Sequence, residues 1–277
     1  MNARRLGAAA AAATLALTLA ACGSSDGGSG DSSGGKGLKI GIKFDQPGLG
    51  LKKGSEFTGM DVDVAKYVAK ALGTAEGDIT WVQAPSAQRE TLISTGQVDM
   101  VVATYSITDA RKEKISFAGP YFIAGQDLLV RADDSSITGP DSLAGKKLCS
   151  VTGSTSAQNV KEKVPGVNLQ EFGTYSECVA ALASGAIDAL TTDDTILAGY
   201  AAQDQYKGKL KVVGKPFSTE NYGIGIKKGD TAMCQKITDA IKTMISDGSW
   251  QKAVDSNLGP AGYKPGADNP PTPASCS

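Results

Sequence analysis

The segment Val-Asp-Met-Val-Val-Ala-Thr-Tyr-Ser-Ile-Thr-Asp-Ala-Arg, residues 98–111, joins a short apolar strand to a polar end. Residues 98–103 are typical of a strand buried in a parallel sheet. Thr104 and Ser106 follow the strand at once, and Arg111 comes shortly after. A planar guanidinium binds a carboxylate through two hydrogen bonds, and hydroxyl and backbone N–H groups can donate to the same anion. The segment therefore predicts a carboxylate-binding cradle at the carboxyl end of a sheet.

The same residues allow a second interpretation. Asp109-Ala110-Arg111-Lys112-Glu113-Lys114 is also typical of a solvated, charge-balanced helical turn whose first residue is capped by Thr108. The first interpretation buries Arg111 in a site, whereas the second leaves it in water.

Strand-like and helix-like patterns alternate along the chain, which indicates an α/β fold. A first βαβαβ unit is complete by residue 103, and a second follows after a break. We expect strands at 38–43, 79–83, 98–103, 147–151, 167–172 and 187–191, and helices at 60–72, from Ser86 to Gly96, at 156–164 and from the capping box 174–177.

A helix-stop-strand cassette occurs twice. Leu92-Ile93-Ser94-Thr95-Gly96-Gln97-Val98-Asp99 and Leu182-Ala183-Ser184-Gly185-Ala186-Ile187-Asp188 share their Leu, Ser, Gly and Asp positions. This predicts two similar lobes, each a mostly parallel sheet flanked by helices. Extended segments at 125–131 and 217–226 would be the two hinge crossings. Small ligands bind at the carboxyl ends of parallel strands, so we expect a binding cleft between the lobes.

These patterns predict six consecutive regions. They are a signal peptide at 1–21, a flexible Gly/Ser tether at 22–37, the first part of lobe 1 at 38–129, lobe 2 at 130–221, the return segment of lobe 1 at 222–260, and a C-terminal tail at 261–277. The Pro-rich tail is expected to be extended and attached chiefly at Cys276.

The N-terminus indicates export. Arg4 and Arg5 precede an apolar stretch at 6–20, which has the length of a secretory signal core. Leu19-Ala20-Ala21-Cys22 resembles the processing box of bacterial lipoproteins, and the Gly/Ser-rich run that follows is typical of a tether. We therefore expect a lipid on Cys22. The alternative is an ordinary signal peptide that ends near a cysteine.

Composition excludes several classes of function. The chain has no histidine, which rules out Ser-His-Asp and Cys-His catalysis and His-containing metal sites. Its net charge of −1 argues against a nucleic-acid partner. No metal or other cofactor is expected, and no CxxC pair suggests zinc.

The four remaining cysteines form an even set in an exported chain, which favours disulfides. Three pairings are open. We favour Cys149–Cys178, which flank one βαβ unit, and Cys234–Cys276, which would tie the tail to the preceding helix.

Several motifs, in this order, resemble the polar amino-acid branch of the bacterial solute-binding proteins that serve ABC importers (family 3). They are Phe57-Thr58-Gly59-Met60-Asp61-Val62-Asp63-Val64-Ala65, residues 98–111, Phe117-Ala118-Gly119-Pro120-Tyr121, Thr152-Gly153-Ser154-Thr155-Ser156 and residues 187–193. The resemblance covers residue 38 to about 258. It is greatest to glutamate-binding lipoproteins of high-GC Gram-positive bacteria, through Ile40-Gly41-Ile42-Lys43-Phe44-Asp45-Gln46-Pro47-Gly48.

The resemblance implies roles for five residues. Arg111 would bind the ligand α-carboxylate, and Thr104 and Ser106 would donate hydrogen bonds from lobe 1. Thr155 would donate from lobe 2, and Asp193 would accept the α-ammonium. Asp193 is alternatively a helix N-cap, and Asp194 can exchange roles with it.

Relatives that take acidic amino acids carry basic residues at the positions of Lys43 and Arg89. A second ligand carboxylate would satisfy both, so L-glutamate is the leading ligand and aspartate the next. Glutamine becomes the alternative if only one of the two faces the ligand. The plainer interpretation is a solvated strand-end Lys43 and an exposed Arg89 paired with Glu90.

The function implied is capture of an amino acid at the outer face of the cell membrane, where Cys22 anchors the chain, and delivery to ABC permease subunits. No GxxxxGK[ST] loop is present, so the importer's ATPase would supply the energy. A sensing lipoprotein and an exported enzyme on the same scaffold are the alternatives. Glu220 and Asp45 are the acid/base candidates for the enzyme, and neither lies in a recognisable catalytic motif, so we expect no enzyme.

Overall fold

A computed structural model describes residues 37–276, which fall within one compact unit, Gly35–Ser277. The predicted signal peptide, the lipidation site Cys22 and nearly all of the tether lie outside the described residues. Within residues 37–276, every helix is too short or too polar to cross a bilayer.

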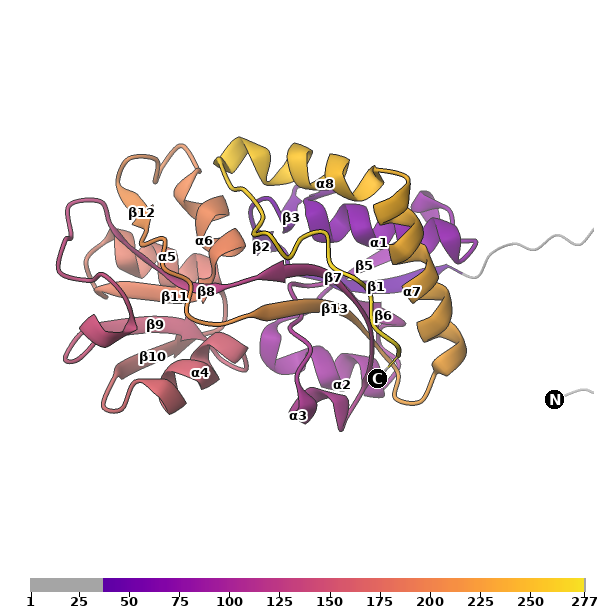
Figure 1. Cartoon of the computed structure of the whole chain (residues 1–277), viewed down its shortest axis with the longest axis horizontal. Helices are drawn as coiled ribbons and strands as arrows, with labels where there is room; N and C mark the ends of the chain where they lie inside the picture. Colours follow the sequence, from indigo (N-terminus) through magenta and orange to yellow (C-terminus); the bar gives the residue numbers. More distant parts are fainter. Residues whose placement is uncertain (1–36, 277) are drawn as a thin grey trace, which may run out of the picture. The chain divides into compact units, whose positions relative to one another are not determined.

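The first sheet forms the centre of what we call lobe 1 (Figure 1). Its strands lie in the order β5-β1-β6-β13-β7 and comprise β1 (Leu38–Ile42), β5 (Ile79–Gln83), β6 (Met100–Val101), β7 (Ser116–Ala124) and β13 (Glu220–Ile226). One face is covered by α1 (Met60–Ala71), α7 (Thr231–Ser246) and α8 (Ser249–Asn257), and the other by α2 (Arg89–Ser94) and the short α3 (Asp109–Lys112). Alternation along β6 explains the two layers, because Met100 packs toward α1 whereas Val101 packs toward α2.

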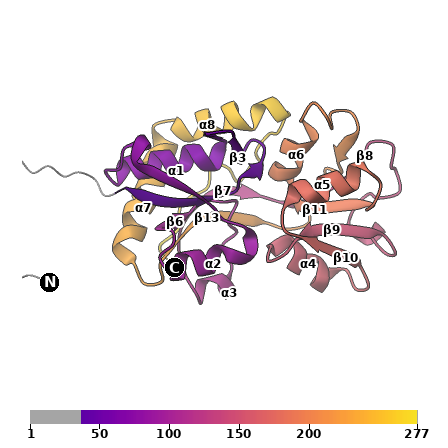
Figure 2. The ribbon, with the colours of Figure 1, turned by 180° about the vertical axis from the view of Figure 1, so that it is seen from behind.

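The second sheet forms the centre of lobe 2, in the order β10-β9-β11-β8-β12. Its strands are β8 (Gln126–Arg131), β9 (Lys147–Val151), β10 (Asn168–Phe172), β11 (Ala189–Asp193) and β12 (Leu210–Val212), and its helices are α4 (Thr155–Lys163), α5 (Tyr175–Ala183) and α6 (Asp194–Ala201). Leu148 packs with Val160 of α4, and the next residue, Cys149, packs with Cys178 of α5, so α4 and α5 cover opposite faces (Figure 2).

A small antiparallel sheet, which the sequence patterns did not predict, joins β1 to α1. It consists of β2 (Asp45–Gln46), β3 (Gly50–Lys53) and β4 (Glu56–Thr58). Short 3-10 turns complete the chain at Glu76–Asp78, Ser86–Gln88, Pro140–Ser142 and Gly259–Ala261.

The two-lobed α/β architecture predicted from the sequence is confirmed, but the pairing is more mixed than expected. Parallel pairs join β5-β1-β6 in lobe 1 and β10-β9-β11 in lobe 2. The pairs that involve β7, β8, β12 and β13 are antiparallel. The parallel pairs are those made by βαβ units, which need a helical crossover, whereas β7 pairs with β13 and β8 with β12 around the two passages between the lobes.

The chain passes between the sheets at Gly125, between β7 and β8, and again at residues 213–219, between β12 and β13 (Figure 1). At Gly125 the two passages approach closely, because a Cβ there would lie 2.7 Å from Cβ of Pro216. The lobe boundaries at residues 129/130 and 221/222 stay predictions.

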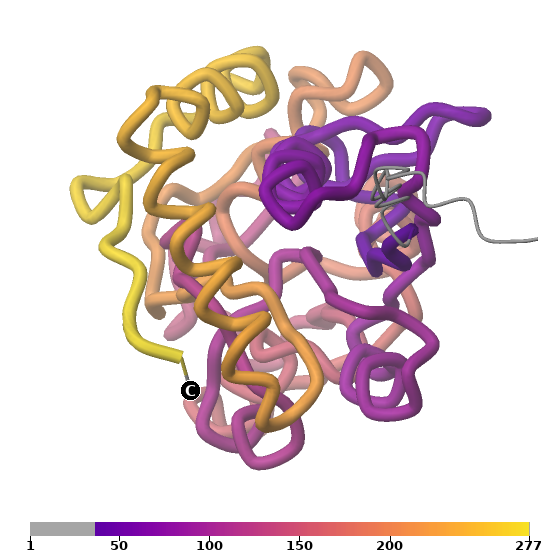
Figure 3. Tube along the Cα trace, turned by 90° about the vertical axis from the view of Figure 1, so that its right-hand side faces the viewer, coloured from indigo at the N-terminus to yellow at the C-terminus, as the bar shows by residue number. Residues whose placement is uncertain are grey.

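The tail is attached more firmly than expected. The Asn269 side chain pairs with both backbone groups of Ile123, at 3.0 Å from its N and 2.8 Å from its O. Ala274 forms a β-bridge with Gly119, so the tail covers the edge strand β7 (Figure 3). Both favoured disulfides, Cys149–Cys178 and Cys234–Cys276, are present in the structure, and the second ties the tail to α7.

Local helix-start signals were reliable at two of three places. Thr174 opens α5 with a capping box, and Thr108 caps α3. Ser86, expected to cap the next helix, instead begins a 3-10 turn, and α2 starts at Arg89. The Ser86 hydroxyl accepts a hydrogen bond from Lys43 at 2.8 Å, so a contact distant in sequence takes the group that was predicted to cap.

Candidate functional site

A small cavity of about 10 Å³ lies where the two lobes meet. Its lining is almost wholly polar and comes from both lobes. The lining residues are Ser86, Arg89, Thr104, Ser154, Thr155, Ser156, Tyr175, Thr192, Asp193 and Ile196. Four of the residues predicted for the site, Arg89, Thr104, Thr155 and Asp193, are therefore brought to one cavity. Lys43, Ser106 and Arg111 lie around it.

Thr104 has a strained backbone in this cavity. Its φ of 45° is the only positive value among the described residues other than glycine. A buried carboxylate holds this conformation, because Thr104 N donates to Oδ2 of Asp61 at 2.9 Å, while Tyr121 donates to Oδ1 of Asp61 at 2.7 Å. Burial raises the pKa of Asp61 to about 6. The hydroxyl of Thr104 donates to Ala103 O at 2.8 Å.

Asp61 was missed as a member of the site. It lies in the first turn of α1 and is fully buried. A signal was present in the sequence, because Asp61 shares the apolar helix face with Val64 and Val68 at helical spacing. A carboxylate at such a position must have buried hydrogen-bond donors.

Arg89 is buried at the edge of the cavity, with 2% of its surface exposed. Its Nη1 donates to Ala103 O at 3.0 Å, and its guanidinium lies 4.0 Å from the ring centroid of Tyr105. Its Nε is buried and has no hydrogen-bond partner among the described residues. Burial, and then the nearby Arg111, lower the pKa of Arg89 to about 10. The interpretation of Arg89 as an exposed helix residue is therefore wrong.

Lys43 is also buried, with 5% exposed, so it is not a solvated strand-end lysine. Its Nζ donates to the hydroxyl of Ser86, a residue of the cavity lining. Lys43 itself lines an adjoining hollow of similar size, together with Asp45 and Tyr175. Burial, and then the charge of Arg89, lower the pKa of Lys43 to about 7.

Arg111 is buried and binds groups of both lobes. Its Nη1 donates to Ser106 O at 2.8 Å, its Nη2 donates to Gly153 O of lobe 2 at 3.1 Å, and its Nε lies 3.4 Å from Oε1 of Glu90. A buried guanidinium excludes the solvated-turn interpretation for this residue. Arg111 does not itself line the cavity in this conformation, so its binding of an α-carboxylate stays a prediction.

Hydroxyl groups meet across the two lobes. Thr155 begins α4, whose N-cap Ser154 accepts a hydrogen bond from Ala157 N. The hydroxyls of Thr155 and Ser106 lie 3.4 Å apart, which places both predicted donors at the junction. The N-terminus of α4 also favours an anion near Thr155.

Asp193 and Asp194, which the sequence left interchangeable, have separate surroundings. Asp193 lines the cavity and accepts a hydrogen bond from Tyr222 at 2.6 Å, and its side chain makes no N-cap bond. Burial, and then Glu220, raise its pKa well above the usual range. Asp194 instead accepts from Gly125 N, Thr195 N and Tyr263 OH, so it holds the hinge.

The two acid/base candidates for catalysis are held by other groups. Glu220 accepts hydrogen bonds from Ser218 and Asn159, and Asp45 accepts from Ser176 N. Neither residue lines the cavity. Among residues 37–276, no group of three His, Cys, Asp or Glu side chains is arranged to hold a metal ion.

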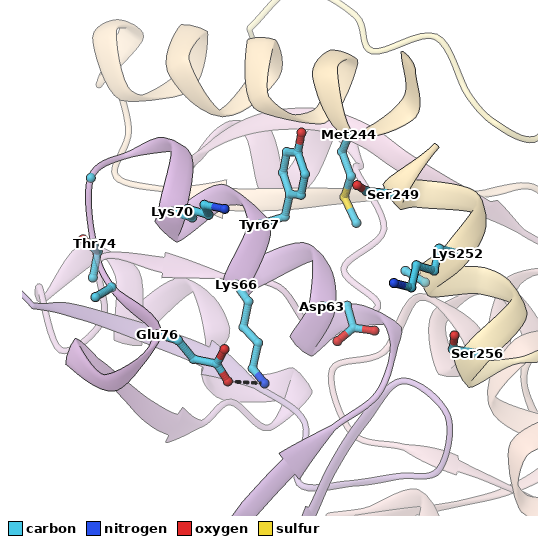
Figure 4. A pocket seen from close by; sticks show the side chains of 13 residues that line it. Asp63, Lys66, Tyr67, Lys70, Thr74, Glu76, Met244, Ser249, Lys252 and Ser256 are labelled. Carbon is cyan, nitrogen blue, oxygen red and sulfur yellow. Dashed lines mark ion pairs between the residues drawn. The ribbon is translucent and has the colours of Figure 1, made fainter. Parts of the chain in front are cut away.

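A larger surface hollow, of about 740 Å³, lies between α1 and α8 (Figure 4). Lys66 and Glu76 form an ion pair there at 2.5 Å, and Glu76 is 67% exposed. Charges on this surface are in water, whereas the cleft holds Arg89 and Asp193 buried. The cleft is therefore the candidate site.

Comparisons of the sequence with known proteins find a family match and relatives that are all amino-acid- or solute-binding proteins. Residues 38–260 match the bacterial extracellular solute-binding proteins, family 3. The glutamate-binding protein GluB of Corynebacterium efficiens is 50% identical over 269 residues, which cover 92% of this chain and 91% of that protein. The glutamine-binding protein GlnH of an ABC transporter of Bacillus subtilis is 40% identical over 218 residues, or 78% of each chain.

Solved structures agree with the sequence relatives. An ancestral arginine-binding protein bound to glutamine has a TM-score of 0.75 and 34% identity, and the match covers 80% of this chain and 97% of that one. The family match spans most of the chain, and the cleft described above lies within it. The chain belongs to the bacterial extracellular solute-binding proteins, family 3.

Proposed function

We propose that this chain is a lipoprotein that captures an acidic amino acid, with glutamate preferred, and delivers it to ABC permease subunits in the membrane. The observation that carries the proposal is the buried guanidinium of Arg89 at the cavity, whose Nε has no partner among the described residues. Such a donor indicates an anionic ligand group that reaches this end of the cavity.

Three cations lie close together on the lobe 1 side. Arg89 and Arg111 both lie over the ring of Tyr105, at 4.0 and 4.9 Å from its centroid, and the charge of Arg89 lowers the pKa of Lys43. Arg111 has Glu90 at 3.4 Å, but Lys43 donates only to a hydroxyl and Arg89 only to a carbonyl. Because an unpaired buried charge costs roughly 3–5 kcal/mol, this wall favours a ligand with a carboxylate in addition to the α-carboxylate.

The opposite wall carries a carboxyl group. Asp193 of lobe 2 faces the same cavity, where it would accept the α-ammonium. Arg111, with Thr104, Ser106 and Thr155, would bind the α-carboxylate, and Arg89 and Lys43 would bind the side-chain carboxylate. Two carboxylates and one ammonium on a short chain are the groups of glutamate and aspartate.

Closure of the lobes would follow from this division of contacts. A ligand held by Arg111 on lobe 1 gains the contacts of Thr155 and Asp193 only when lobe 2 approaches. Binding therefore shifts the hinge equilibrium toward the closed form, which the permease would recognise.

The experiment is calorimetric titration of residues 23–277, unfolded and refolded to remove carried-over ligand, with glutamate, aspartate, glutamine, asparagine and arginine. We expect micromolar or tighter binding of glutamate, lost in Arg111→Ala and selectively weakened in Arg89→Ala. Binding of glutamine without glutamate would contradict the basic side-chain pocket. No detectable binding of any of the five amino acids would contradict the amino-acid-binding function.

Glutamine is the second candidate ligand. Its amide would suit the buried Nε2 of Gln46, which has no hydrogen-bond partner among the described residues, and the 40% identical GlnH is named for glutamine. The ratio of glutamate to glutamine affinities decides between the two.

Lipid anchoring and transport need separate tests. Incorporation of an alkynyl fatty acid in cells, lost in Cys22→Ser together with release of the protein into the medium, would support the anchor. Uptake of labelled glutamate that requires this chain would support delivery to a permease, and unchanged uptake would favour the sensing lipoprotein.

A further inference from the structure

The lobes also touch outside the cavity, at a cluster that the ligand-binding residues do not include. Asp45 and Pro47 of lobe 1 contact Ser176, Gly199 and Tyr200 of lobe 2. We call these five residues the closure latch. None of them is among the residues that line the cavity.

Asp45 makes the polar contacts of the latch. Its Oδ2 accepts from Ser176 N at 3.2 Å, in the first turn of α5, where an anion is favoured. The hydroxyl of Tyr200 lies 2.5 Å from the backbone O of Asp45 and 3.0 Å from its Oδ2. Tyr200 is 2% exposed, so its hydroxyl proton depends on Asp45 for an acceptor.

Gly199 gives the latch its close fit. A Cβ at this position would lie 2.2 Å from the carbonyl oxygen of Pro47, closer than real atoms approach. Gly199 lies inside α6, where alanine is the better helix former. The glycine therefore costs helix stability within lobe 2, and what it allows is the approach of a carbonyl from lobe 1.

We propose that the closure latch is a positioning device that stabilises the closed form of the lobes without contacting the ligand. The proposal rests on the proposed function, namely that a ligand is held by closure of the cleft. Because the latch forms only when the lobes meet, its loss increases the dissociation rate of every ligand by one common factor. Residues that contact the ligand side chain, in contrast, change the ratio between ligands.

The test compares Tyr200→Phe and Gly199→Ala with matched controls in lobe 1. Tyr67→Phe removes a hydroxyl that donates to Asp247 at 2.5 Å within the same lobe, and Gly77→Ala adds a methyl group into open space. Stopped-flow and calorimetric titration give dissociation rates and Kd for glutamate, aspartate and glutamine.

We expect Tyr200→Phe to raise the dissociation rate of each bound ligand about threefold to tenfold, the loss typical of one hydrogen bond. Gly199→Ala should weaken binding by at least about tenfold, because Pro47 must move, while its thermal midpoint stays equal or rises. Both controls should bind as the wild type. Small-angle X-ray scattering with saturating ligand should give Gly199→Ala a larger radius of gyration than wild type.

Three results would overturn the latch. They are unequal factors for the three ligands, unchanged binding in Gly199→Ala, or a loss in the two controls of the same size. If the wild type binds no amino acid, the proposed function fails, and the latch is then judged on ligand-free protein. In that case Gly199→Ala must have a larger radius of gyration than Gly77→Ala, and equal radii would contradict it.

Discussion

The two walls of the cleft differ in the chemistry that they bury. The wall of lobe 1 places two cations beside the cavity, Arg89 and Lys43, and neither has an anionic hydrogen-bond partner. The wall of lobe 2 presents hydroxyl groups and one carboxylate, Asp193. Under the proposed function, lobe 1 selects a ligand by its anionic groups, whereas lobe 2 recognises the ammonium that all amino acids share.

The largest effect is expected on the lobe 2 wall. Asp193→Asn should weaken binding of every amino acid about 100-fold or more, since it removes the carboxylate that we propose accepts the α-ammonium. The same change should stabilise the ligand-free protein at pH 7. Burial and Glu220 raise the pKa of Asp193, so an acidic side chain at this position costs folding free energy at pH 7, and the neutral asparagine removes that cost. Calorimetry and thermal unfolding measure the two effects.

Asp194→Asn is the matched control for Asp193→Asn. Asp194 accepts three hydrogen bonds, including one from the hinge residue Gly125, and it does not line the cavity. We expect a smaller loss of affinity. The thermal midpoint should be equal or higher, because the amide oxygen of asparagine can accept the same three hydrogen bonds, all of which end on Oδ1, and because burial also raises the pKa of Asp194. Equal behaviour of the two variants would remove the distinction between the cavity carboxylate and the hinge carboxylate.

The next effect tests whether lobe 1 selects the ligand. Arg89→Leu should weaken glutamate about 30-fold or more while glutamine changes only a few fold, because a buried charge pair is lost only for the acidic ligand. Titration with both ligands gives the ratio. Arg131→Leu is the control, since Arg131 pairs with Asp188 away from the cavity. A parallel fall for both ligands in Arg89→Leu would mean that Arg89 supports the fold of the wall and not selectivity.

A smaller effect concerns the protonation of Lys43. Its folded-state pKa is about 7, against 10.5 for the free side chain. Between these values the unfolded state holds a proton that the folded state lacks, so this residue makes ligand-free stability rise with pH in that window. A ligand carboxylate restores the charge, so glutamate binding at pH 8 should take up a proton, at most about one per ligand.

Proton uptake is measured by calorimetry in buffers of different ionisation enthalpy. Lys43→Met should remove the proton uptake at pH 8. At pH 6 it should change the proton uptake little, because Lys43 is protonated there with or without ligand. Because Asp193 also faces the cavity, the difference between wild type and Lys43→Met is the quantity to compare. The same uptake in both proteins would show that Lys43 does not sense the ligand.

The smallest effect is expected at Thr104. Thr104→Gly relieves the strain of a positive φ in the folded state, but it also increases the conformational entropy of the unfolded chain. These two effects should offset each other, so the free energy of unfolding should change by less than about 1 kcal/mol. Affinity should fall only a few fold, and equally for glutamate and glutamine, since one hydroxyl is lost. Chemical unfolding and titration measure these changes. A large, ligand-dependent loss would place Thr104 among the residues that select the side chain.

Signals carried by neighbouring residues were reliable guides to the fold. Alternating strand and helix patterns predicted β1, α1 and β5 closely, and the capping box at Thr174 predicted the start of α5. The helix-stop-strand cassette at residues 92–99, which recurs at residues 182–188, indicated two lobes. Both Asp side chains accept a hydrogen bond from the backbone N of a neighbouring strand, Lys39 and Lys147 respectively, which explains why the cassette repeats.

Site prediction was less complete. Four of the seven predicted ligand contacts line one cavity, and the burial of Lys43, Arg89 and Arg111 excludes the surface alternatives. Asp61 was missed, because its partners Thr104 and Tyr121 are 43 and 60 residues away. Asp45 was considered only as a catalytic acid, and its contacts with Ser176 and Tyr200 come from the other lobe.

Features that depend on neighbours along the chain were readable before the fold was known: most strands and helices, two helix caps, an even set of cysteines and a polar end on a buried strand. The burial of Arg89 and Lys43 without an anionic hydrogen-bond partner, and the glycine that faces the other lobe, became visible only in the folded protein. Propensity and periodicity act over a few residues, whereas the desolvation of Arg89 and the space at Gly199 are set by atoms that folding brings from distant parts of the chain.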